Sequence, residues 1–285
     1  GLSSQKNYLA SNFYLKLASY LNPDFLSYNT LYAENLEIIK QYPEAKMEYK
    51  KIKNIGSNYN WHASKQIASI LKKQEKKQEA IKYLQNSFLK IKKPKIYEIF
   101  EYAEFLKNNE QYHEAIEHYS RLIESINKEH NLYPRALDGR GVAYERTNQW
   151  DKAEIDLLKS LSISPEDAYT INYLAYSWIE KEINIEKSLE MLKKANRLRP
   201  NDGYIIDSLG WALFKLKKYK EAKKYMQSAV RLMASDPVIN DHFANVLWMN
   251  DNFIQARYYW EYVLNLEKTE TKLKKKIEHK LLFGL

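Results

Sequence analysis

A small residue recurs at a nearly constant interval along the whole chain, and this interval constrains the fold more than any other feature of the sequence. The successive steps are 34, 35, 35, 38, 35, 34 and 34 residues. The recurring residues are Ser11, Ala45, Ala80, Ala115, Ala153, Ser188, Ala222 and Ala256. An interval of this length holds two helices and two turns, so it predicts one helical hairpin repeated along the chain.

The stretch from Gly203 to Asp236 displays the pattern inside one unit. Apolar residues fall three and four positions apart in two separate runs, which is the spacing of one face of an α-helix. These residues are Ile206, Leu209 and Leu213 in the first run and Met226, Ala229 and Leu232 in the second. Gly210 and Ala222 lie beside one run each, and their small side chains would let two antiparallel helices approach closely. The stretch is therefore predicted to form a tightly packed helical hairpin.

This pattern resembles the tetratricopeptide repeat (TPR), which places large residues at positions 4, 7, 11 and 24 of a 34-residue unit and small residues at positions 8, 20 and 27. The resemblance implies an all-α fold, a TPR α-solenoid in which helical hairpins form a right-handed superhelix with a C-terminal capping helix. In this register, residues 1–25 form the second helix of a partial repeat, residues 26–270 form seven repeats, and residues 271–285 form the capping helix. Because residue 1 falls in the middle of a repeat, we expect it to be a processing or cloning boundary.

Irregularities in the repeat predict two longer connections and one ion pair. The 38-residue step places extra residues at Asn127–Tyr133, between two repeats, and a second insertion at Ile183–Asn184 lengthens a turn within a repeat. Arg140 occupies position 7, which normally carries leucine. An unpaired buried guanidinium group would be costly, so Arg140 either extends to solvent or pairs with a carboxylate, and we favour the pair.

The chain carries a formal charge of +9, and a single segment holds a larger surplus than the whole. Lys46–Lys95 contains fourteen lysines against Glu48, Glu75 and Glu79, so the rest of the chain is nearly neutral. Such a segment can bind nucleic acid or an anionic membrane surface. It contains no arginine, the residue that binds phosphate through two parallel hydrogen bonds, so a solvated outer face is the favoured interpretation.

The sequence lacks the motifs of catalysis and of metal or cofactor binding. It has no cysteine, which rules out disulfides, thiol catalysis and cysteine-based zinc sites, and it has no glycine-rich phosphate loop, GxSxG or HExxH motif. His113 and His118 are the closest histidine pair, but a separation of five residues does not place two rings on one helical face. No apolar run approaches the roughly 20 residues of a membrane-spanning helix. We therefore expect no enzymatic activity, no cofactor and no metal site.

The resemblance places a binding surface on the first helix of each hairpin, where positions 2, 5, 9, 12 and 13 point inward in TPR proteins. In the last three repeats these positions are aromatic with regularly spaced polar residues. The predicted protein-binding residues are Tyr169, Asn172, Tyr176, Tyr204, Asp207, Trp211, Phe214, Asp241, Asn245 and Trp248. Tyr and Trp dominate interface hot spots, and Asn or Asp at one fixed position can hydrogen-bond an extended peptide. The alternative is that the aromatic residues only pack neighbouring first helices together.

Four segments are similar to multi-TPR proteins of proteobacteria, namely residues 136–146, 172–177, 202–212 and 236–242. Some of those proteins are outer-membrane lipoproteins that act as adaptors and present substrates such as cell-wall hydrolases to carboxy-terminal processing proteases. The resemblance implies a non-enzymatic scaffold on the periplasmic side of a bacterial cell envelope. Its partner would be a protein or peptide, such as an envelope protease or a cell-wall hydrolase, rather than a small molecule. Because the chain has no cysteine to carry a lipid, an anchor would lie upstream of residue 1.

Two alternatives to this hypothesis stay open at the level of the sequence. The first is a cytoplasmic location, which the absence of cysteine permits equally well. The second is a binder of nucleic acid or anionic membrane that acts through Lys46–Lys95, although the lack of arginine does not favour nucleic acid as the partner.

Overall fold

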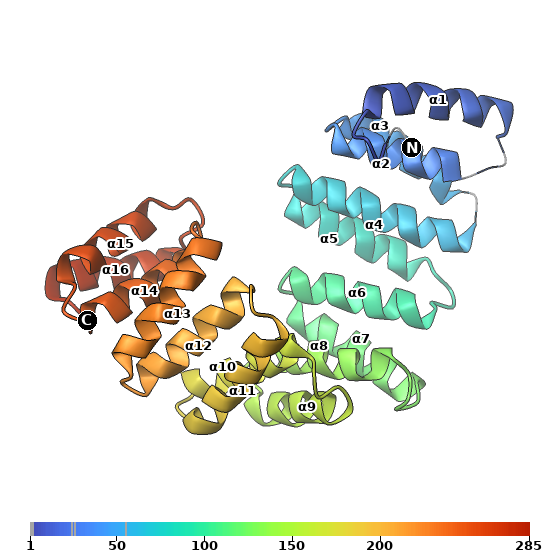
Figure 1. Cartoon of the computed structure of the whole chain (residues 1–285). Coiled ribbons are helices and arrows are strands. Elements are labelled where there is room, and N and C mark those ends of the chain that lie inside the picture. Colours follow the sequence, from blue (N-terminus) through green and yellow to red (C-terminus); the bar gives the residue numbers. More distant parts are fainter. Residues whose placement is uncertain (1–2, 24, 26, 55) are drawn as a thin grey trace. The chain divides into compact units, whose positions relative to one another are not determined.

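The computed structural model describes residues 3–23, 25, 27–54 and 56–285, and these residues form sixteen α-helices and no strand (Figure 1). In chain order the helices are α1 (Tyr8–Leu21), α2 (Ser27–Ile38), α3 (Tyr42–Lys53), α4 (Ser57–Lys73), α5 (Lys77–Leu89), α6 (Ile96–Asn108), α7 (Tyr112–Ser125), α8 (Leu132–Arg146), α9 (Trp150–Ile163), α10 (Ala168–Glu180), α11 (Ile185–Leu198), α12 (Gly203–Lys215), α13 (Tyr219–Leu232), α14 (Pro237–Trp248), α15 (Phe253–Asn265) and α16 (Thr271–Phe283). The all-α fold predicted from the repeat is confirmed. Within the described residues, no helix combines the length and apolar character needed to cross a membrane.

Consecutive helices pack against each other from α1 to α7 and from α8 to α16, in the order that the repeat predicts. The pairs from α2–α3 to α14–α15 each contain a first and a second helix, α1 is a second helix, and α16 packs on α15. The chain forms two compact units, residues 1–127 with α1–α7 and residues 128–285 with α8–α16. The boundary between the units falls in the connection from α7 to α8, where the sequence predicts a longer loop. The expected start of the first full repeat, residue 26, lies outside the described residues.

The recurring small residues are buried in the hairpins. All eight are at most 5% exposed, and the six alanines among them are fully inaccessible. At Gly210, a Cβ atom would lie 3.0 Å from Cγ of Met226 on the partner helix α13, so the two backbones approach closely there. Large side chains at these positions would separate the helices, which explains why small residues recur at this interval.

Three first helices of the second unit begin at an aspartate N-cap. The side chains of Asp167, Asp202 and Asp236 each accept two hydrogen bonds, at 3.0–3.2 Å, from backbone N–H groups in the first turns of α10, α12 and α14. These N–H groups have no partner inside the helix, and such a cap typically stabilises the folded chain by about 1 kcal/mol. The caps fix where each helix begins and so bring equivalent repeat positions to one side of the second unit.

The turn from first to second helix has a recurring backbone shape. In six hairpins the residue two places before the second helix adopts a left-handed conformation, with φ between 60° and 67°. These residues are Lys40, Glu75, Glu110, Asn148, Lys217 and Asp251. The turn between α10 and α11 differs because Glu182 and Asn184 are both left-handed, as expected where the sequence predicts an inserted residue.

The ion pair expected at Arg140 is present. Its Nε and Nη2 atoms donate hydrogen bonds to the two carboxylate oxygens of Asp156 at 2.6 and 2.9 Å. The guanidinium group also lies 5.6 Å from the ring centre of Tyr144. Since Arg140 is on α8 and Asp156 is on α9, a two-point charged contact joins the helices of this hairpin where leucine would otherwise pack.

Replacing Gly210 with leucine is expected to lower the free energy of unfolding by about 1–3 kcal/mol, because the added side chain meets Met226 and forces α12 away from α13. Chemical denaturation measures this loss. Gly56→Leu is the matched control, because a Cβ atom at Gly56 has open space around it. Hydrogen exchange is expected to rise first in α12–α16, since neighbouring hairpins stabilise one another. Unchanged stability in the Gly210 variant, or exchange that rises equally in the first unit, would contradict this packing.

Candidate protein-binding surface

The predicted binding residues lie on three first helices of the second unit, which pack side by side in the order α10, α12 and α14. We call the surface formed by repeat positions 2, 5, 9 and 12 of these helices the first-helix face. The structure places the ten predicted residues on it as three groups that differ in accessibility. The exposed group is Tyr169 and Tyr204, the half-buried group is Asn172, Tyr176, Trp211, Phe214 and Trp248, and the buried group is Asp207, Asp241 and Asn245.

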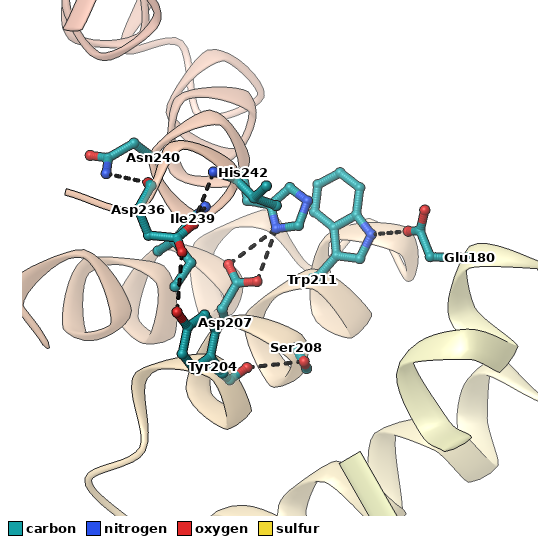
Figure 2. A network of polar contacts seen from close by, with 10 residues as sticks. Glu180, Tyr204, Asp207, Ser208, Trp211, Asp236, Ile239, Asn240 and His242 are labelled. Carbon is teal, nitrogen blue, oxygen red and sulfur yellow. Dashed lines mark hydrogen bonds and ion pairs between the residues drawn. The ribbon is translucent and has the colours of Figure 1, made fainter. Parts of the chain in front are cut away.

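A buried ion pair links α12 to α14 at the centre of the first-helix face (Figure 2). Nδ1 of His242 lies 3.1 and 3.0 Å from the two carboxylate oxygens of Asp207, and both side chains are less than 10% exposed. The imidazole ring stacks on the indole ring of Trp211, with ring centres 4.0 Å apart. Asp207 therefore already holds a partner from the neighbouring helix.

The environment of His242 favours its protonated form. Burial disfavours a charged imidazolium, but the charge and hydrogen bond of Asp207 outweigh burial and raise the pKa of His242 above its ordinary value. The nearby carboxylates of Asp241 and Glu180 act in the same direction. When protonated, His242 forms an ion pair that links α14 to Asp207 of α12.

Trp211 contacts neighbouring side chains through its indole N–H group and through its ring. Its indole Nε1 donates a hydrogen bond to Glu180 of α10 at 2.6 Å, as Figure 2 shows. Its ring also stacks on Phe214, with ring centres 4.7 Å apart and planes 7° from parallel. The imidazole ring of His242 also stacks on Trp211, so Trp211 packs neighbouring first helices together. This contact is the alternative role that the sequence leaves open for the aromatic residues.

A second buried cluster joins α14 to α15 and to the C-terminal helix α16. Nζ of Lys280 lies 2.6 and 2.9 Å from the carboxylate oxygens of Asp241 and 2.9 Å from Oδ1 of Asn245. The indole Nε1 of Trp260 donates to the same two side chains at 3.1 and 3.2 Å. Asp241 and Asn245 are therefore occupied by donors from the last two helices.

Trp248 is covered by the end of the chain. The guanidinium group of Arg257 lies 5.4 Å from its ring centre, and a side chain at Gly284 would clash with the indole ring. Gly284 has φ of 85°, a conformation that glycine adopts without strain. The sequence predicts Trp248 as a partner-binding residue, and the structure places it beneath the C-terminal residues.

Three side chains of α10 share one face, and two of them keep an unsatisfied polar group. Tyr169 is 55% exposed, with the guanidinium group of Arg199 5.2 Å from its ring centre. Oδ1 of Asn172 is buried and has no hydrogen-bond partner among the residues that the structure describes. The hydroxyl group of Tyr176 makes no hydrogen bond within the described part of the chain, and burial together with the charges of Glu180 and Asp207 raises its pKa. Positions 169, 172 and 176 are three and four residues apart, so these groups line one side of the helix.

Tyr204 continues this accessible row on α12. It is 54% exposed, and its hydroxyl group lies 3.4 Å from a carboxylate oxygen of Asp236, a long contact for a hydrogen bond (Figure 2). Tyr169 and Tyr204 occupy position 2 of successive first helices. The accessible part of the first-helix face is thus a tyrosine row on α10 and α12 with Val238 at the same position of α14, whereas its acidic residues are internal.

Sequence reasoning missed His242, Glu180 and Lys280, which satisfy the acidic and indole groups of the face. The repeat pattern assigns positions within one hairpin, whereas each of these contacts joins different hairpins. One signal was present. His242 follows Asp207 by 35 residues, which is about the length of one repeat. The two residues therefore lie at nearly equivalent positions of neighbouring first helices. The assignment of the ten residues to partner binding stays a prediction.

The lysine-rich segment Lys46–Lys95 lies in the first unit, and at least five of its fourteen lysines pair with an acidic side chain in the described part of the chain. The pairs are Lys51–Glu48, Lys65–Glu101, Lys73–Glu37, Lys76–Glu79 and Lys77–Glu110, with N–O distances from 2.6 to 3.5 Å. Pairs of this kind at a surface contribute little to stability. They do lower the positive charge that the segment would present to a polyanion.

The described residues hold no cluster of three or more His, Cys, Asp or Glu side chains placed to bind a metal ion. The charged contacts on the first-helix face are acid–base pairs between helices.

Comparison with known proteins agrees with the fold. The tetratricopeptide repeat family model matches residues 206–235, which lie in the α12–α13 hairpin. TPR repeat-containing protein PA4667 of Pseudomonas aeruginosa is 28% identical over 129 residues, which is 45% of this chain and 21% of the length of that relative. The chain therefore aligns with about a fifth of the relative.

Solved structures resemble a larger part of the chain. A tetratricopeptide repeat protein from Parabacteroides merdae is 15% identical, with a TM-score of 0.68 over 88% of this chain and 96% of that chain. The Cut9–Hcn1 hetero-tetramer of the APC/C contains a chain that is 15% identical, with a TM-score of 0.68 over 96% of this chain and 52% of that chain. The repeat match at residues 206–235 and these likenesses show that the chain contains a tetratricopeptide repeat and has the fold of tetratricopeptide repeat proteins. Proteins of this class are generally non-enzymatic scaffolds for protein interactions.

The Asp207–His242 pair is expected to make the stability of the second unit depend on pH. Because the folded chain raises the pKa of His242, the pair's contribution is complete below the ordinary histidine pKa of about 6.5 and is lost as pH rises through the raised value. The free energy of unfolding of the wild type minus that of His242→Gln is therefore expected to be larger at pH 6 than at pH 9. Chemical denaturation followed by tryptophan fluorescence measures the free energy of unfolding of both proteins at each pH. A difference that does not change with pH would contradict the charged pair.

Proposed function

We propose that this chain is a non-enzymatic scaffold whose first-helix face holds an extended segment of a partner protein. The observation that carries the proposal is the tyrosine row on α10 and α12. Tyr169 and Tyr204 are more than half exposed, and beside them Tyr176 has a hydroxyl group without a hydrogen bond among the described residues. Tyrosine rings supply apolar area with little loss of side-chain freedom, and their hydroxyl groups can pair with peptide groups.

The paired acids define the kind of partner that fits. Asp207 and Asp241 are neutralised by His242 and Lys280, so the face offers a partner little net charge at its centre. A peptide that relied on those carboxylates would have to displace a buried cation, which is costly. The proposed partner segment therefore binds through apolar and hydrogen-bonding groups, and its affinity depends weakly on salt.

Alanine replacement of Tyr169 or Tyr204 is expected to weaken partner binding by roughly 2 kcal/mol each, the usual loss at an interface hot spot. Both side chains are more than half exposed, so the variants are expected to stay folded. Partners captured from the native organism by the wild type and by the double variant are compared by mass spectrometry. Calorimetry with the captured partner then measures each loss.

Tyr97→Ala is the matched control. Tyr97 is 56% exposed and occupies the same repeat position in the first unit, so its replacement removes an equivalent ring away from the proposed face. The proposal expects this variant to bind normally. Equal losses from Tyr97 and Tyr204, or no loss from Tyr169 and Tyr204, would reject the first-helix face as the binding surface.

Lys72→Ala tests the alternative function. Binding through Lys46–Lys95 predicts that this variant loses affinity for a DNA duplex or for anionic vesicles, and that the affinity falls steeply between about 50 and 200 mM salt. The proposed face predicts no effect of Lys72 on the protein partner. A loss confined to the lysine variant would replace the proposal with the electrostatic alternative.

The proposed compartment is the periplasmic side of a bacterial cell envelope, and the proposed partners are an envelope protease or a cell-wall hydrolase. Support comes from the similarity of residues 136–146, 172–177, 202–212 and 236–242 to multi-TPR proteins of proteobacteria, some of which are envelope adaptors. Fractionation of the native organism tests the compartment. Recovery in the cytoplasmic fraction, or capture of cytoplasmic partners alone, would reject this part of the proposal.

A further inference from the structure

A lysine in the first unit occupies a repeat position that is apolar in most of the other hairpins. Lys53 lies at position 28, at the C-terminal end of the second helix α3. Five other second helices carry an apolar residue at position 28, and all five of these side chains are buried or half-buried. They are Phe88, Ile123, Leu161, Val230 and Leu264. An ammonium group placed where the repeat packs apolar side chains is costly unless it is paired with a carboxylate.

The amine of Lys53 reaches the next second helix, α5. Its Nζ donates a hydrogen bond to Oγ of Ser87 at 3.1 Å and lies 3.4 Å from the hydroxyl oxygen of Tyr83, a long contact for a hydrogen bond. Nζ also lies 5.0 Å from the centre of the Tyr83 ring. Ser87 is buried, whereas Lys53 and Tyr83 are half-buried. The amine is therefore held between α3 and α5 and stays partly accessible to solvent.

No carboxylate pairs with Lys53 within the residues that the structure describes. Five other lysines of the same segment do have such a partner. Burial raises the pKa of the Tyr83 phenol, although the charges of Lys50 and Lys90 act in the opposite direction. Tyr83 is therefore neutral near pH 7 and gives Lys53 no negative charge to pair with. The charged groups near this tyrosine are lysines.

The contacts of Nζ match a neutral amine. An ammonium group has three N–H donors, whereas a neutral amine has two and a lone pair. Ser87 and Tyr83 offer two acceptors, so a neutral amine can satisfy both donors and turn its lone pair away from them. Burial lowers the pKa of Lys53 below its ordinary value. The Tyr83 ring attracts a cation, but such a contact contributes little at an accessible site.

We propose that Lys53 is a modification site whose amine accepts an acyl group from an acyl phosphate. A neutral lysine amine is a nucleophile. Its nitrogen attacks the acyl carbon, so that an N–C bond forms and the C–O bond to phosphate breaks. The phosphate leaves with the electron pair of that bond, and the amine loses one proton to solvent. Lys50 and Lys90 attract the anionic phosphate end of the reagent.

The product of this reaction suits its place in the repeat. The amide is uncharged and keeps one N–H group that can bond Ser87. Acylation therefore replaces a cation at position 28 with a neutral side chain, which is the kind of side chain that most other hairpins carry there. The site lies in the first unit and does not depend on partner binding by the first-helix face.

The experiment treats the whole chain with acetyl phosphate and follows acetylation of each lysine by mass spectrometry. At pH 7.5, Lys53 is expected to react at least threefold faster than Lys72, an exposed lysine of the same segment. Between pH 7 and pH 10.5, the rate at Lys53 is expected to level off at a lower pH than the rate at Lys72. A rate at Lys53 no greater than at Lys72, or the same pH dependence at both lysines, would overturn the proposal.

A carboxylate placed beside the amine tests the missing counter-charge. Ser87→Asp is expected to slow acetylation of Lys53 at least threefold at pH 7.5, because an ion pair keeps the lysine protonated. Asn86→Asp is the matched control, since Asn86 is exposed on the same helix and the added charge is equal. Circular dichroism verifies the fold of both variants. Equal rates in the two variants would contradict the proposal.

Removal of two exposed lysines tests the class of acyl donor. The double variant Lys50→Gln, Lys90→Gln is expected to slow the reaction of Lys53 with acetyl phosphate at least twofold, because less positive charge attracts the reagent. Both side chains are exposed, so the variant is expected to stay folded. Lys82→Gln, at another exposed position of α5, is the control and is expected to react normally. An unchanged rate in the double variant would reject acyl phosphates as the donors.

Discussion

The second unit depends on acidic side chains that are buried between neighbouring first helices. A carboxylate on one helix has to find a cation or a hydrogen-bond donor, since an unpaired buried charge would cost several kcal/mol. Asp207 finds His242 one hairpin further along, and Asp241 finds Lys280 on the C-terminal helix. Each pair fixes the position of one hairpin relative to the next. Alanines at the helix crossings hold each hairpin together, and the buried acids hold successive hairpins together.

This division of roles determines which side chains are left for a partner. Trp211 is stacked on His242 and bonded to Glu180, and Trp248 lies under the C-terminal residues, so the large indole rings belong to the interior of the face. Tyr169 and Tyr204, both in the first turn of their helices, stay more than half exposed. The proposed binding of a partner therefore depends on Tyr169 and Tyr204, whereas the indole groups of Trp211 and Trp248 pack the helices beneath them.

The repeat allowed the fold to be predicted from sequence, because its signal lies in spacing within one hairpin. Ala45, Ala222 and the other recurring small residues are buried as expected, and Arg140 pairs with Asp156 on the adjacent helix. The candidate site was only partly predictable. Its residues were placed on the correct helices, but the partners of Asp207 and Asp241 could not be identified, because the spacing pattern carries no information on which donor of the next hairpin reaches a given carboxylate. The same limit applies to Trp248, which is covered by a glycine that no repeat position specifies.

A double-mutant cycle on Asp207 and His242 tests the central claim most directly. The free energies of unfolding of the wild type, Asp207→Ala, His242→Ala and the double variant are measured at pH 6, where the histidine is protonated. The account predicts a coupling energy of at least about 1 kcal/mol between the two residues, because each single variant leaves the other group buried without its partner. Additive effects, with a coupling energy near zero, would show that the pair does not join the hairpins and would contradict the account.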